Sequence, residues 1–252
     1  MTREGNYLKK YRFAHNDQTF TADQLDEQLE PIRNGSLKAD SRFRQTFKLV
    51  EGPSVLDVGC SIGAVSYTLA KDHPDWDILG VDILEDSVSI ANDKMTLPNT
   101  RYEVRDILTN PVNANTFDCV IFLETIEHVD VPGQFIREFY RALKPGGCLV
   151  ISTPNALAVQ SFARHFGQDI KKRLHAIKDE PHNTGSHLEH VGLYDVYTLA
   201  RMLDRNGFDY VEHHYARFHI PLSRQRYVQL GLFETLLKPM CDTVIIKARK
   251  RM

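Results

Sequence analysis

The stretch Val55-Leu56-Asp57-Val58-Gly59-Cys60-Ser61-Ile62-Gly63 decides which fold this chain is expected to adopt. Its apolar beginning predicts a buried strand, and the glycines that follow predict a tight turn. Gly59 and Gly63 have no side chains, so a ligand can approach the backbone of this turn closely. A helix that begins near Ile62 points its unpaired N–H groups into the same crevice. On these grounds we expect a nucleotide-like ligand at a strand–turn–helix unit.

Strand-like and helical segments alternate from this turn onward. The predicted strands of the central part are 54–58, 77–81, 101–104, 119–123 and 148–152, and the helices between them are 62–72, 86–95 and 133–143. Strands spaced by helices of this length are typical of βαβ units around a parallel sheet. Right-handed crossovers then place helices on both faces of the sheet. The chain is therefore predicted to have an α/β fold.

The two ends of the chain differ from this central part. Residues 1–50 are polar with scattered aromatic side chains and are predicted to be helical, whereas residues 155–190 are polar and rich in histidine. A helix is predicted over 195–205, because an Asn-Gly pair marks its end. The strand candidates 209–219 and 242–248 follow this helix. They favour an antiparallel pair at the edge of the sheet.

Composition limits the kinds of partner that we expect. A net charge of −2 creates no strong field for polyanions, which makes nucleic acid an unlikely partner. The four cysteines lie far apart and form no C-x-x-C pair, so we expect buried, reduced thiols: Cys60, Cys119, Cys148 and Cys241. The polar N-terminus lacks the apolar core of a signal peptide, and no apolar run reaches about 18 residues. We therefore expect a cytoplasmic protein without a membrane span.

Carboxylates stand at the ends of the second and third predicted strands. Asp82 follows Gly59 by 23 residues and can accept hydrogen bonds from both ribose hydroxyls of a nucleotide. Its alternative role is that of N-cap for the next helix. Asp106 can accept a hydrogen bond from an adenine amino group, with Ile83 and Ile107 as apolar faces for the ring. These strand ends meet at the edge where open α/β sheets bind ligands.

Five segments in this order resemble the motifs of class I S-adenosylmethionine methyltransferases. They are Val55–Gly63, Gly80–Asp82, Arg105–Asp106, Phe117–Ile121 and Leu143–Gly147, the last followed by Val150–Asn155. Ser61 stands where that family most often has glycine, whereas a dehydrogenase would have a G-x-G-x-x-G turn. The resemblance implies a Rossmann-like fold with a mostly parallel seven-stranded sheet and an antiparallel edge strand. It also implies methyl transfer from S-adenosylmethionine as cofactor.

The resemblance assigns parts of the chain to roles. It implies one methyltransferase domain over 1–252, with an N-terminal cap at 1–50, a cofactor-binding half at 51–155, and an acceptor lid with the last strands at 156–252. Asp57 then orients the methionine amino group, and the carbonyl of Leu123 faces the ammonium. The implied cofactor-binding residues are Asp57, Gly59, Cys60, Ser61, Gly63, Asp82, Ile83, Asp106, Ile107 and Leu123.

The segment Glu124-Thr125-Ile126-Glu127-His128 follows the fourth predicted strand and has three interpretations. In the first, His128 shapes the cofactor pocket and the downstream histidines lie at the surface. In the second, one imidazole is a general base that removes a proton from a hydroxyl near neutral pH. The candidates for the general base are His128, His187 and His190, and the downstream histidines of the first interpretation are His175, His182, His187 and His190.

In the third interpretation a divalent ion (Mg²⁺, Mn²⁺ or Zn²⁺) is bound and lowers the pKa of the acceptor hydroxyl. Its ligands would be Glu124, Glu127, His128 and His190. The Glu-x-x-Glu-His pattern is similar to that of ubiquinone-biosynthesis O-methyltransferases. It is also similar to small-RNA 2′-O-methyltransferases, which have a histidine four residues before an aromatic residue, as His190 precedes Tyr194.

These residues favour methyl transfer to a hydroxyl oxygen of a small molecule. Oxygen is preferred over nitrogen because an amine is already nucleophilic and needs a base or metal less. The catalytic candidates are His128, His190 and Glu124. The alternatives are N- or C-methylation of a sugar or secondary metabolite, RNA 2′-O-methylation, and a non-catalytic module that binds S-adenosylmethionine. The oligomeric state does not follow from the sequence.

Overall fold

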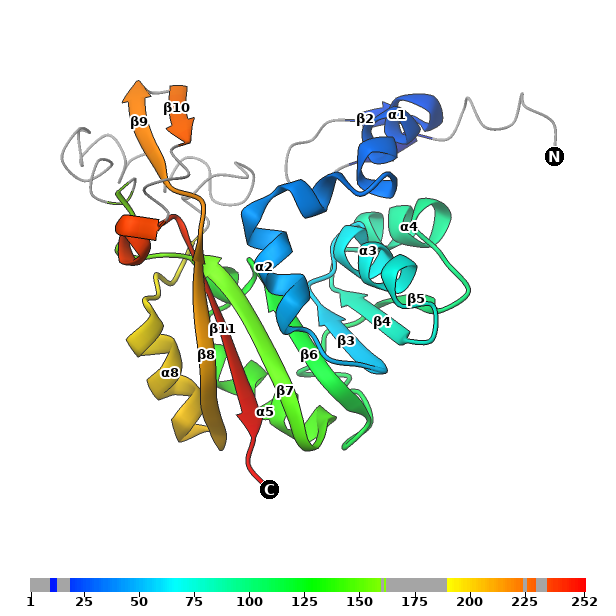
Figure 1. Cartoon of the computed structure of the whole chain (residues 1–252). Coiled ribbons are helices and arrows are strands. Elements are labelled where there is room, and N and C mark those ends of the chain that lie inside the picture. The colour runs from blue at the N-terminus through cyan, green and yellow to red at the C-terminus, as the bar shows by residue number, and fades with distance from the viewer. Residues whose placement is uncertain (1–9, 13–18, 160, 162–189, 224–225, 230–234) are drawn as a thin grey trace.

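A computed structural model describes residues 10–12, 19–159, 161, 190–223, 226–229 and 235–252 (Figure 1). Seven strands form one sheet in the order β5-β4-β3-β6-β7-β11-β8. Their bounds are β3 (Ser54–Val58), β4 (Asp77–Asp82), β5 (Thr100–Val104), β6 (Phe117–Leu123), β7 (Leu143–Pro154), β8 (Phe208–Ala216) and β11 (Thr243–Lys250). The mostly parallel seven-stranded sheet predicted from the sequence is thereby confirmed.

The antiparallel part of the sheet lies at one edge, as predicted. β3 to β7 pair in parallel with one another, whereas β11 is antiparallel to both β7 and β8. β11 therefore lies one place inside the edge, and β8 is the outermost strand. The consequence for function is that β3 to β7 all end at one side of the sheet, together with the start of β11.

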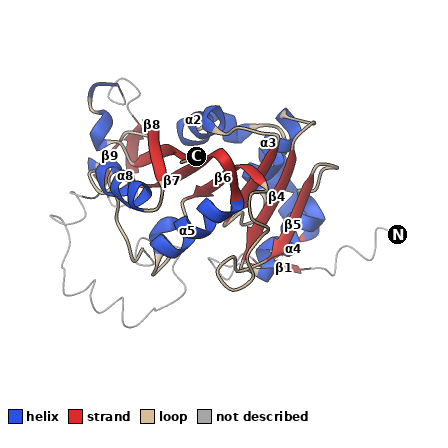
Figure 2. Cartoon of the chain, turned by 90° about the horizontal axis from the view of Figure 1, so that it is seen from below, coloured by secondary structure: helices blue, strands red, loops and turns tan. Residues whose placement is uncertain are grey.

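Helices cover both faces of the sheet (Figure 2). Their bounds are α2 (Ser41–Leu49), α3 (Ala64–Asp72), α4 (Glu85–Lys94), α5 (Pro132–Ala142) and α8 (Val196–Arg205). Phe122, Phe139 and Leu199 belong to a buried cluster between the sheet and the helices α5 and α8. Leu49, Ile121 and Leu69 belong to a second cluster beneath α2 and α3. The central strand β6 is thus buried on both sides, which explains its continuous apolar run.

The N-terminal part contains the predicted helices, preceded by a short hairpin. This part consists of β1 (Lys10–Arg12), β2 (Thr19–Thr21), α1 (Ala22–Arg33) and the 3-10 helix η2 (Ser36–Ala39), followed by α2. Leu25 and Leu29 of α1 are buried against side chains of α3 and α4. Arg33 and Lys94 both form ion pairs with Asp26, which ties α1 to the end of α4.

Several element boundaries differ from the prediction, most by one or two residues; the largest shift is that of β7, which begins at Leu143 and not at residue 148. The helix predicted from residue 62 begins at Ala64, because Gly63 has φ 78 and is its N-cap. The strand predicted over 209–219 is interrupted at Arg217, which has φ 59. β8 ends before it, and β9 (His219–Ser223) begins after it and pairs with β10 (Arg226–Gln229).

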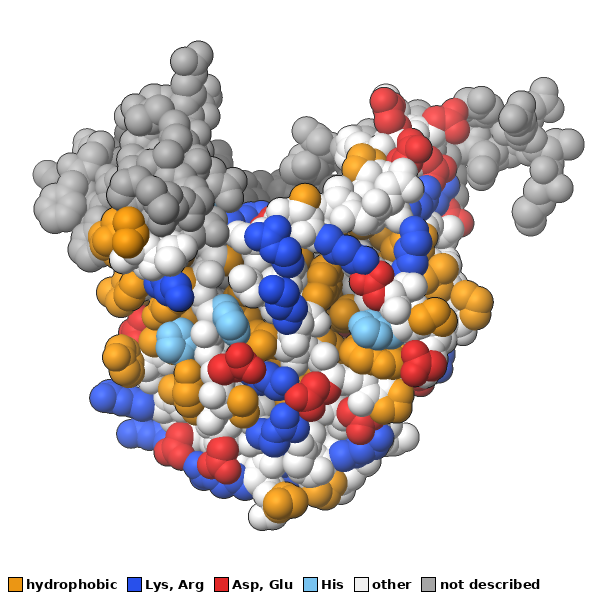
Figure 3. Space-filling model, in the orientation of Figure 1, with side chains coloured by type: hydrophobic (Ala, Val, Ile, Leu, Met, Phe, Trp, Pro, Cys, Tyr) orange, Lys and Arg blue, Asp and Glu red, His pale blue; other side chains and the backbone are white. Residues whose placement is uncertain are grey.

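Several features of the described residues bear on the expectations from composition. All four cysteines are free and buried, as predicted. Among the described helices, none has the length and apolar character that a membrane crossing requires. On the face that carries α2 and α3, basic and acidic side chains are interspersed (Figure 3). The remaining short elements of the described residues are the 3-10 helices η3 (Ile126–His128), which follows β6, and η4 (Lys238–Met240), which precedes β11.

Candidate active site

The turn after β3 is folded onto the end of β4 by backbone hydrogen bonds. The N–H groups of Gly59 and Cys60 donate to the carbonyl of Val81 at 2.8 and 3.1 Å. The N–H of Ser61 donates to the Asp82 Oδ2 at 2.8 Å. Gly63 closes the turn by donating to the Cys60 carbonyl at 2.9 Å. The turn is therefore held by its own backbone and one carboxylate.

The glycines of this turn are required by both backbone conformation and space. Gly59 has φ 72, and a Cβ there would lie 2.6 Å from the Oγ1 of Thr125. Gly63 has φ 78, and a Cβ there would lie 2.7 Å from the ring of Tyr102. Ser61 has φ 49, in the left-handed region that favours glycine. This conformation explains physically why the family pattern has glycine at the Ser61 position.

Asp57 and Asp82 place two carboxyl groups beneath the turn. Asp57 is 2% exposed and accepts a hydrogen bond of 2.6 Å from the hydroxyl of Ser66. Burial raises the pKa of Asp57 to about 7, and the nearby charge of Asp82 adds to this effect. Asp82 also accepts the N–H of Leu84 at 3.0 Å. Leu84 is the N-cap of α4, so the alternative role of Asp82 as helix cap is wrong.

The other predicted cofactor-binding residues lie along the same end of the sheet. Asp106 accepts hydrogen bonds from the Leu108 N–H at 2.9 Å and from the hydroxyl of Thr109 at 3.1 Å. Ile83 is 68% exposed, whereas Ile107 is buried in the core, so only Ile83 offers an open apolar side chain. The Leu123 carbonyl accepts the hydroxyl of Thr125 at 2.9 Å.

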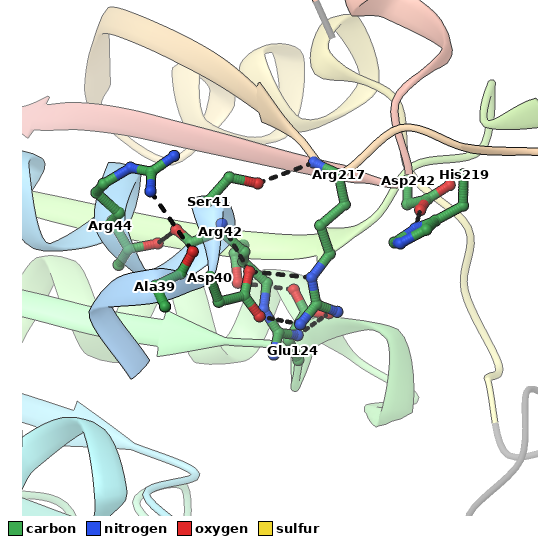
Figure 4. A network of polar contacts seen from close by, with 11 residues as sticks. Ala39, Asp40, Ser41, Arg42, Arg44, Glu124, Arg217, His219 and Asp242 are labelled. Atoms are coloured by element: carbon green, nitrogen blue, oxygen red, sulfur yellow. Dashed lines mark hydrogen bonds and ion pairs between the residues drawn. The ribbon is translucent and has the colours of Figure 1, made fainter. Parts of the chain in front are cut away.

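Glu124 is fixed by an ion pair that the sequence did not indicate. Its backbone has φ 49, and its carboxylate lies 2.9 Å from Arg42 Nη1 and accepts the hydroxyl of Ser152 at 2.8 Å (Figure 4). Arg42 belongs to the first turn of α2, and its side chain is 16% exposed. Because 82 positions separate these two residues, no local spacing relates them. The carboxylate of Glu124 is thus held by the ion pair with Arg42 and the hydrogen bond from Ser152.

Glu127, His128 and His190 come together, as the third interpretation requires. One potential ligand atom from each lies within 4.8 Å of the others. The rings of His128 and His190 meet edge to face with centroids 4.9 Å apart. Glu124 lies outside this group, and His175, His182 and His187 lie outside the described residues. We call Glu127, His128 and His190 the Glu-His-His cluster.

Glu127 is the buried member of the cluster. It is 1% exposed, and its carboxyl accepts a hydrogen bond of 2.8 Å from the hydroxyl of Thr153. Burial raises the pKa of Glu127 to about 7, and the charge of Glu124 raises it further. The Glu127 carbonyl accepts the N–H groups of Val191 and Gly192 at 2.8 and 3.1 Å. These bonds bring the chain around His190 to the end of β6.

Comparison with known proteins identifies the family. A family model described as a methyltransferase domain matches residues 13–213. The chain belongs to this family. Phosphoethanolamine N-methyltransferase 1 of wheat (Triticum aestivum) is 31% identical over 70% of this chain and 32% of its own length. A ubiquinone biosynthesis O-methyltransferase of Coxiella burnetii is 35% identical over 42% of this chain and 45% of its own length.

The solved structures agree with this assignment at the level of the fold. A SAM-dependent methyltransferase from Archaeoglobus fulgidus has a TM-score of 0.57 and 19% identity, covering 90% of this chain and 98% of the other. This chain therefore carries a class I S-adenosylmethionine-dependent methyltransferase domain, as the motifs predicted. It spans only about a third of the length of the wheat relative.

The turn of this methyltransferase domain fits S-adenosylmethionine. Three positions of the turn with positive φ (Gly59, Ser61 and Gly63) leave a backbone surface without bulky side chains. The buried carboxyls of Asp57 and Asp82 lie directly beneath it. The cofactor carries an ammonium group and two ribose hydroxyls, which are partners for carboxylates. The carboxyl groups of Asp57 and Asp82 and the open backbone of the turn therefore suit this cofactor.

Proposed function

We propose that this methyltransferase domain transfers a methyl group to a hydroxyl oxygen of a small molecule. The Glu-His-His cluster carries the proposal, because it gathers imidazole and carboxyl groups directly after β6. The same segment borders the cofactor turn, since a Cβ on Gly59 would touch Thr125. Proton-accepting groups therefore lie next to the expected cofactor site. A hydroxyl acceptor needs such groups, because it becomes a strong nucleophile only on losing its proton.

On the cofactor side, we propose the roles that the motifs predicted. Asp57 orients the methionine amino group together with the carbonyl of Leu123, and Asp82 binds the ribose hydroxyls. Asp106 and Ile83 face the adenine. The bound cofactor supplies a methyl group activated by its sulfonium. The remaining proposed contacts come from the turn backbone, at Gly59, Cys60, Ser61 and Gly63, whereas Ile107 is buried in the core and offers no open side chain.

On the acceptor side, the chain must hold the hydroxyl and take up its proton. His128 and His190 are the imidazoles that the sequence predicted for these tasks. Glu124 is ion-paired with Arg42, so we propose that it positions the acceptor and does not accept the proton. This division of roles predicts that His128→Gln and His190→Gln lower turnover more than cofactor affinity.

A divalent ion is a second way in which the cluster can act on a hydroxyl. One carboxylate and two imidazoles form a three-residue ligand set that leaves positions open for an acceptor oxygen. The relevant experiment is elemental analysis together with turnover after chelation and after readdition of Mn²⁺ or Zn²⁺. Loss and recovery of turnover would support the ion. Full turnover in the chelator, with no metal bound, would exclude it.

An amine acceptor is the second candidate function, and sequence similarity favours it. The wheat relative is named a phosphoethanolamine N-methyltransferase, whereas the Coxiella relative is named an O-methyltransferase. Deuterium-labelled S-adenosylmethionine and mass spectrometry can decide between a hydroxyl acceptor and an amine acceptor. Phenols, catechols and polyols would be compared with ethanolamine, phosphoethanolamine and a short RNA. Labelled methyl ethers are the expected products, and label on nitrogen or RNA alone would contradict the proposal.

A further inference from the structure

A large cleft lies at the edge of the sheet that β8 forms. It is lined mainly by the first turns of α8, by β8 and by residues 235–239, and its volume is about 1150 Å³. Figure 1 shows α8 beside β8 at this edge. The described residues that line the cleft include no predicted cofactor-binding residue and no member of the Glu-His-His cluster. Small-molecule sites have volumes of about 300 to 1000 Å³, so the cleft is large enough for an organic ligand. We call it the β8 cleft.

Aromatic side chains form one wall of the β8 cleft. Tyr197 of α8 is 74% exposed, and Tyr210 of β8 is 49% exposed. His213 contacts two tyrosines. Its Nδ1 is hydrogen-bonded to the Tyr210 hydroxyl at 2.7 Å, and its ring meets that of Tyr215 edge to face with centroids 5.2 Å apart. These contacts fix the orientation of rings on which an aromatic ligand can stack.

Exposed aliphatic side chains continue this apolar surface. Leu157 and Leu236 line the β8 cleft and are 42% and 67% exposed. Apolar side chains that gather around one hollow are unfavourable in water, and they are typical of surfaces that bind a ligand or a partner. A ring seated in the cleft would remove part of this surface from water, which stabilises the complex.

The charged groups that line the β8 cleft are basic. Of the described residues in its lining, none is acidic, whereas Lys238 contributes an ammonium group and His213 and His214 contribute imidazoles. Burial lowers the pKa of His213, and the positive charges of His214 and Lys238 lower it further. Lys238 is exposed, and none of the ion pairs between described residues involves it. An anionic group beside Lys238 would therefore be attracted without displacing another carboxylate.

Two carboxylates close to the β8 cleft have partners of their own. Asp195 is the N-cap of α8 and accepts the N–H of Tyr197 at 2.8 Å. Glu212 of β8 lies 3.0 Å from Nε2 of His214. Neither of them lines the cleft. The positive charge of Lys238 thus remains available to a ligand.

We propose that the β8 cleft binds an aromatic carboxylate. The ring of the ligand stacks on the tyrosine wall, and its carboxylate lies beside Lys238 and the imidazole of His213. The described lining is distinct from that of the cofactor turn, so the ligand and S-adenosylmethionine occupy different sites. Binding in the β8 cleft depends neither on the identity of the methyl acceptor nor on the proposed function.

Calorimetry with the full chain and 2-naphthoate tests this site. Two matched compounds separate the contributions, because 2-naphthamide keeps the ring without the charge and cyclohexanecarboxylate keeps the charge without an aromatic ring. We expect 2-naphthoate to bind about three- to tenfold more tightly than either compound. Saturation with S-adenosylhomocysteine should leave this affinity unchanged, since the two ligands have different sites.

Substitutions of Tyr197 and Lys238 test the two halves of the site. Both positions are exposed, so the variants should fold. Tyr197→Ala should weaken 2-naphthoate binding about fivefold, whereas Tyr197→Phe should retain it. Lys238→Gln should weaken binding about threefold and remove the preference over 2-naphthamide. Lys48→Gln changes an exposed lysine of α2 outside the cleft lining and should behave as wild type.

Several results would overturn the assignment of the β8 cleft. These are no binding of 2-naphthoate at about 1 mM, equal affinity for all three compounds, or full affinity in both Tyr197→Ala and Lys238→Gln. Displacement of 2-naphthoate by S-adenosylhomocysteine would instead place the compound at the cofactor turn. A chain that sediments as a dimer and binds none of the compounds would indicate that a second copy covers the cleft, which also contradicts the proposal.

Discussion

The cofactor side and the proposed acceptor side of the candidate active site are constructed in different ways. The cofactor turn, Gly59 to Gly63, comes from one continuous stretch, and its bonds run mainly between backbone groups and to Asp82. The acceptor side is assembled from side chains that are distant in the sequence, including Arg42, Glu124 and His190. Backbone conformation is a local property, whereas an ion pair depends on how the whole chain is folded. The first side can therefore be predicted from sequence, and the second cannot.

Both sides contain residues in the left-handed backbone region. This conformation costs free energy for residues other than glycine. Ser61 on the cofactor side has φ 49, and Glu124 and Arg217 on the acceptor side have φ 49 and 59. In each case the surrounding bonds maintain the conformation. Residues with such strain often lie at functional sites. The four predictions that follow test the two sides separately, beginning with the largest expected effect.

The largest effect is expected on the cofactor side, from Gly59→Ala. The new Cβ would meet Thr125 at 2.6 Å in a backbone with φ 72, so the turn must shift. We expect affinity for S-adenosylhomocysteine to fall at least 100-fold and stability to fall by about 2 to 3 kcal/mol. Gly146→Ala is the control, because Gly146 has φ 73 but nothing within 4 Å of the new Cβ. Calorimetry measures the affinity and urea unfolding measures the stability of both variants. If Gly59→Ala and Gly146→Ala lower them equally, the contact of the new Cβ with Thr125 is not the cause.

On the acceptor side, Glu127→Gln should change how stability depends on pH. The pKa of Glu127 is raised from 4.5 to about 7, so the folded state holds this proton more tightly than the unfolded state. The stabilisation that results is fully present below pH 4.5 and is lost as pH rises through about 7. The stability of the Glu127→Gln variant relative to wild type should increase by about 3 kcal/mol across this window.

Urea unfolding between about pH 4 and about pH 8 measures this difference, and Glu138→Gln on α5 serves as the control. A constant difference between the Glu127→Gln variant and wild type over this range would show that burial does not perturb this carboxyl.

A smaller effect is expected from Asp82→Ala on the cofactor side. The substitution removes the acceptor for the Ser61 and Leu84 N–H groups along with the proposed ribose contact. Affinity for S-adenosylhomocysteine should fall about tenfold or more, since a hydrogen bond to a charged group contributes about 1.5 to 3 kcal/mol. Asp86→Ala, which removes an exposed carboxylate in the first turn of α4, should leave the affinity unchanged. An unchanged affinity of Asp82→Ala for S-adenosylhomocysteine would contradict the proposal that Asp82 binds the ribose hydroxyls.

The smallest effect is expected from Arg42→Gln, which removes the ion pair with Glu124. The pair is partly exposed, so the loss of stability should be about 1 kcal/mol. Turnover should fall severalfold while cofactor affinity stays the same, because the change affects only the acceptor side. Arg44→Gln, an exposed position on the same helix, is the control. A loss of cofactor affinity in Arg42→Gln would show that the two sides are not separable.

The order and type of the elements followed from the sequence with few errors. Alternating apolar and amphipathic segments predicted β3 to β7 and the helices between them, because these patterns reflect burial on a sheet or helix face. The errors were local. The helix after the cofactor turn begins two residues later than predicted, at Ala64, and the last long strand is interrupted at Arg217. Nothing in the residue type of an arginine signals a left-handed backbone.

The histidines show the limit of prediction most clearly. The Glu-x-x-Glu-His segment suggested that Glu124 and Glu127 act together, but Glu124 is not part of the group whose potential ligand atoms lie within 4.8 Å of one another. Glu124 is bound by Arg42, whereas Glu127 lies with His128 and His190. His219 was not considered from the sequence, and its hydrogen bond joins it to Asp242, 23 positions away.

By itself, the sequence determined the α/β fold, the cofactor turn and the family, because glycine conformation and apolar periodicity act over a few residues. Only the tertiary structure decided which charged groups meet on the acceptor side. Those groups are 63 residues apart between Glu127 and His190 and 82 residues apart between Arg42 and Glu124. Their contacts exist only after strand order and register have placed the strand ends side by side. Ion pairs and hydrogen bonds depend on distances of a few ångströms, and no local pattern encodes such distances between remote residues.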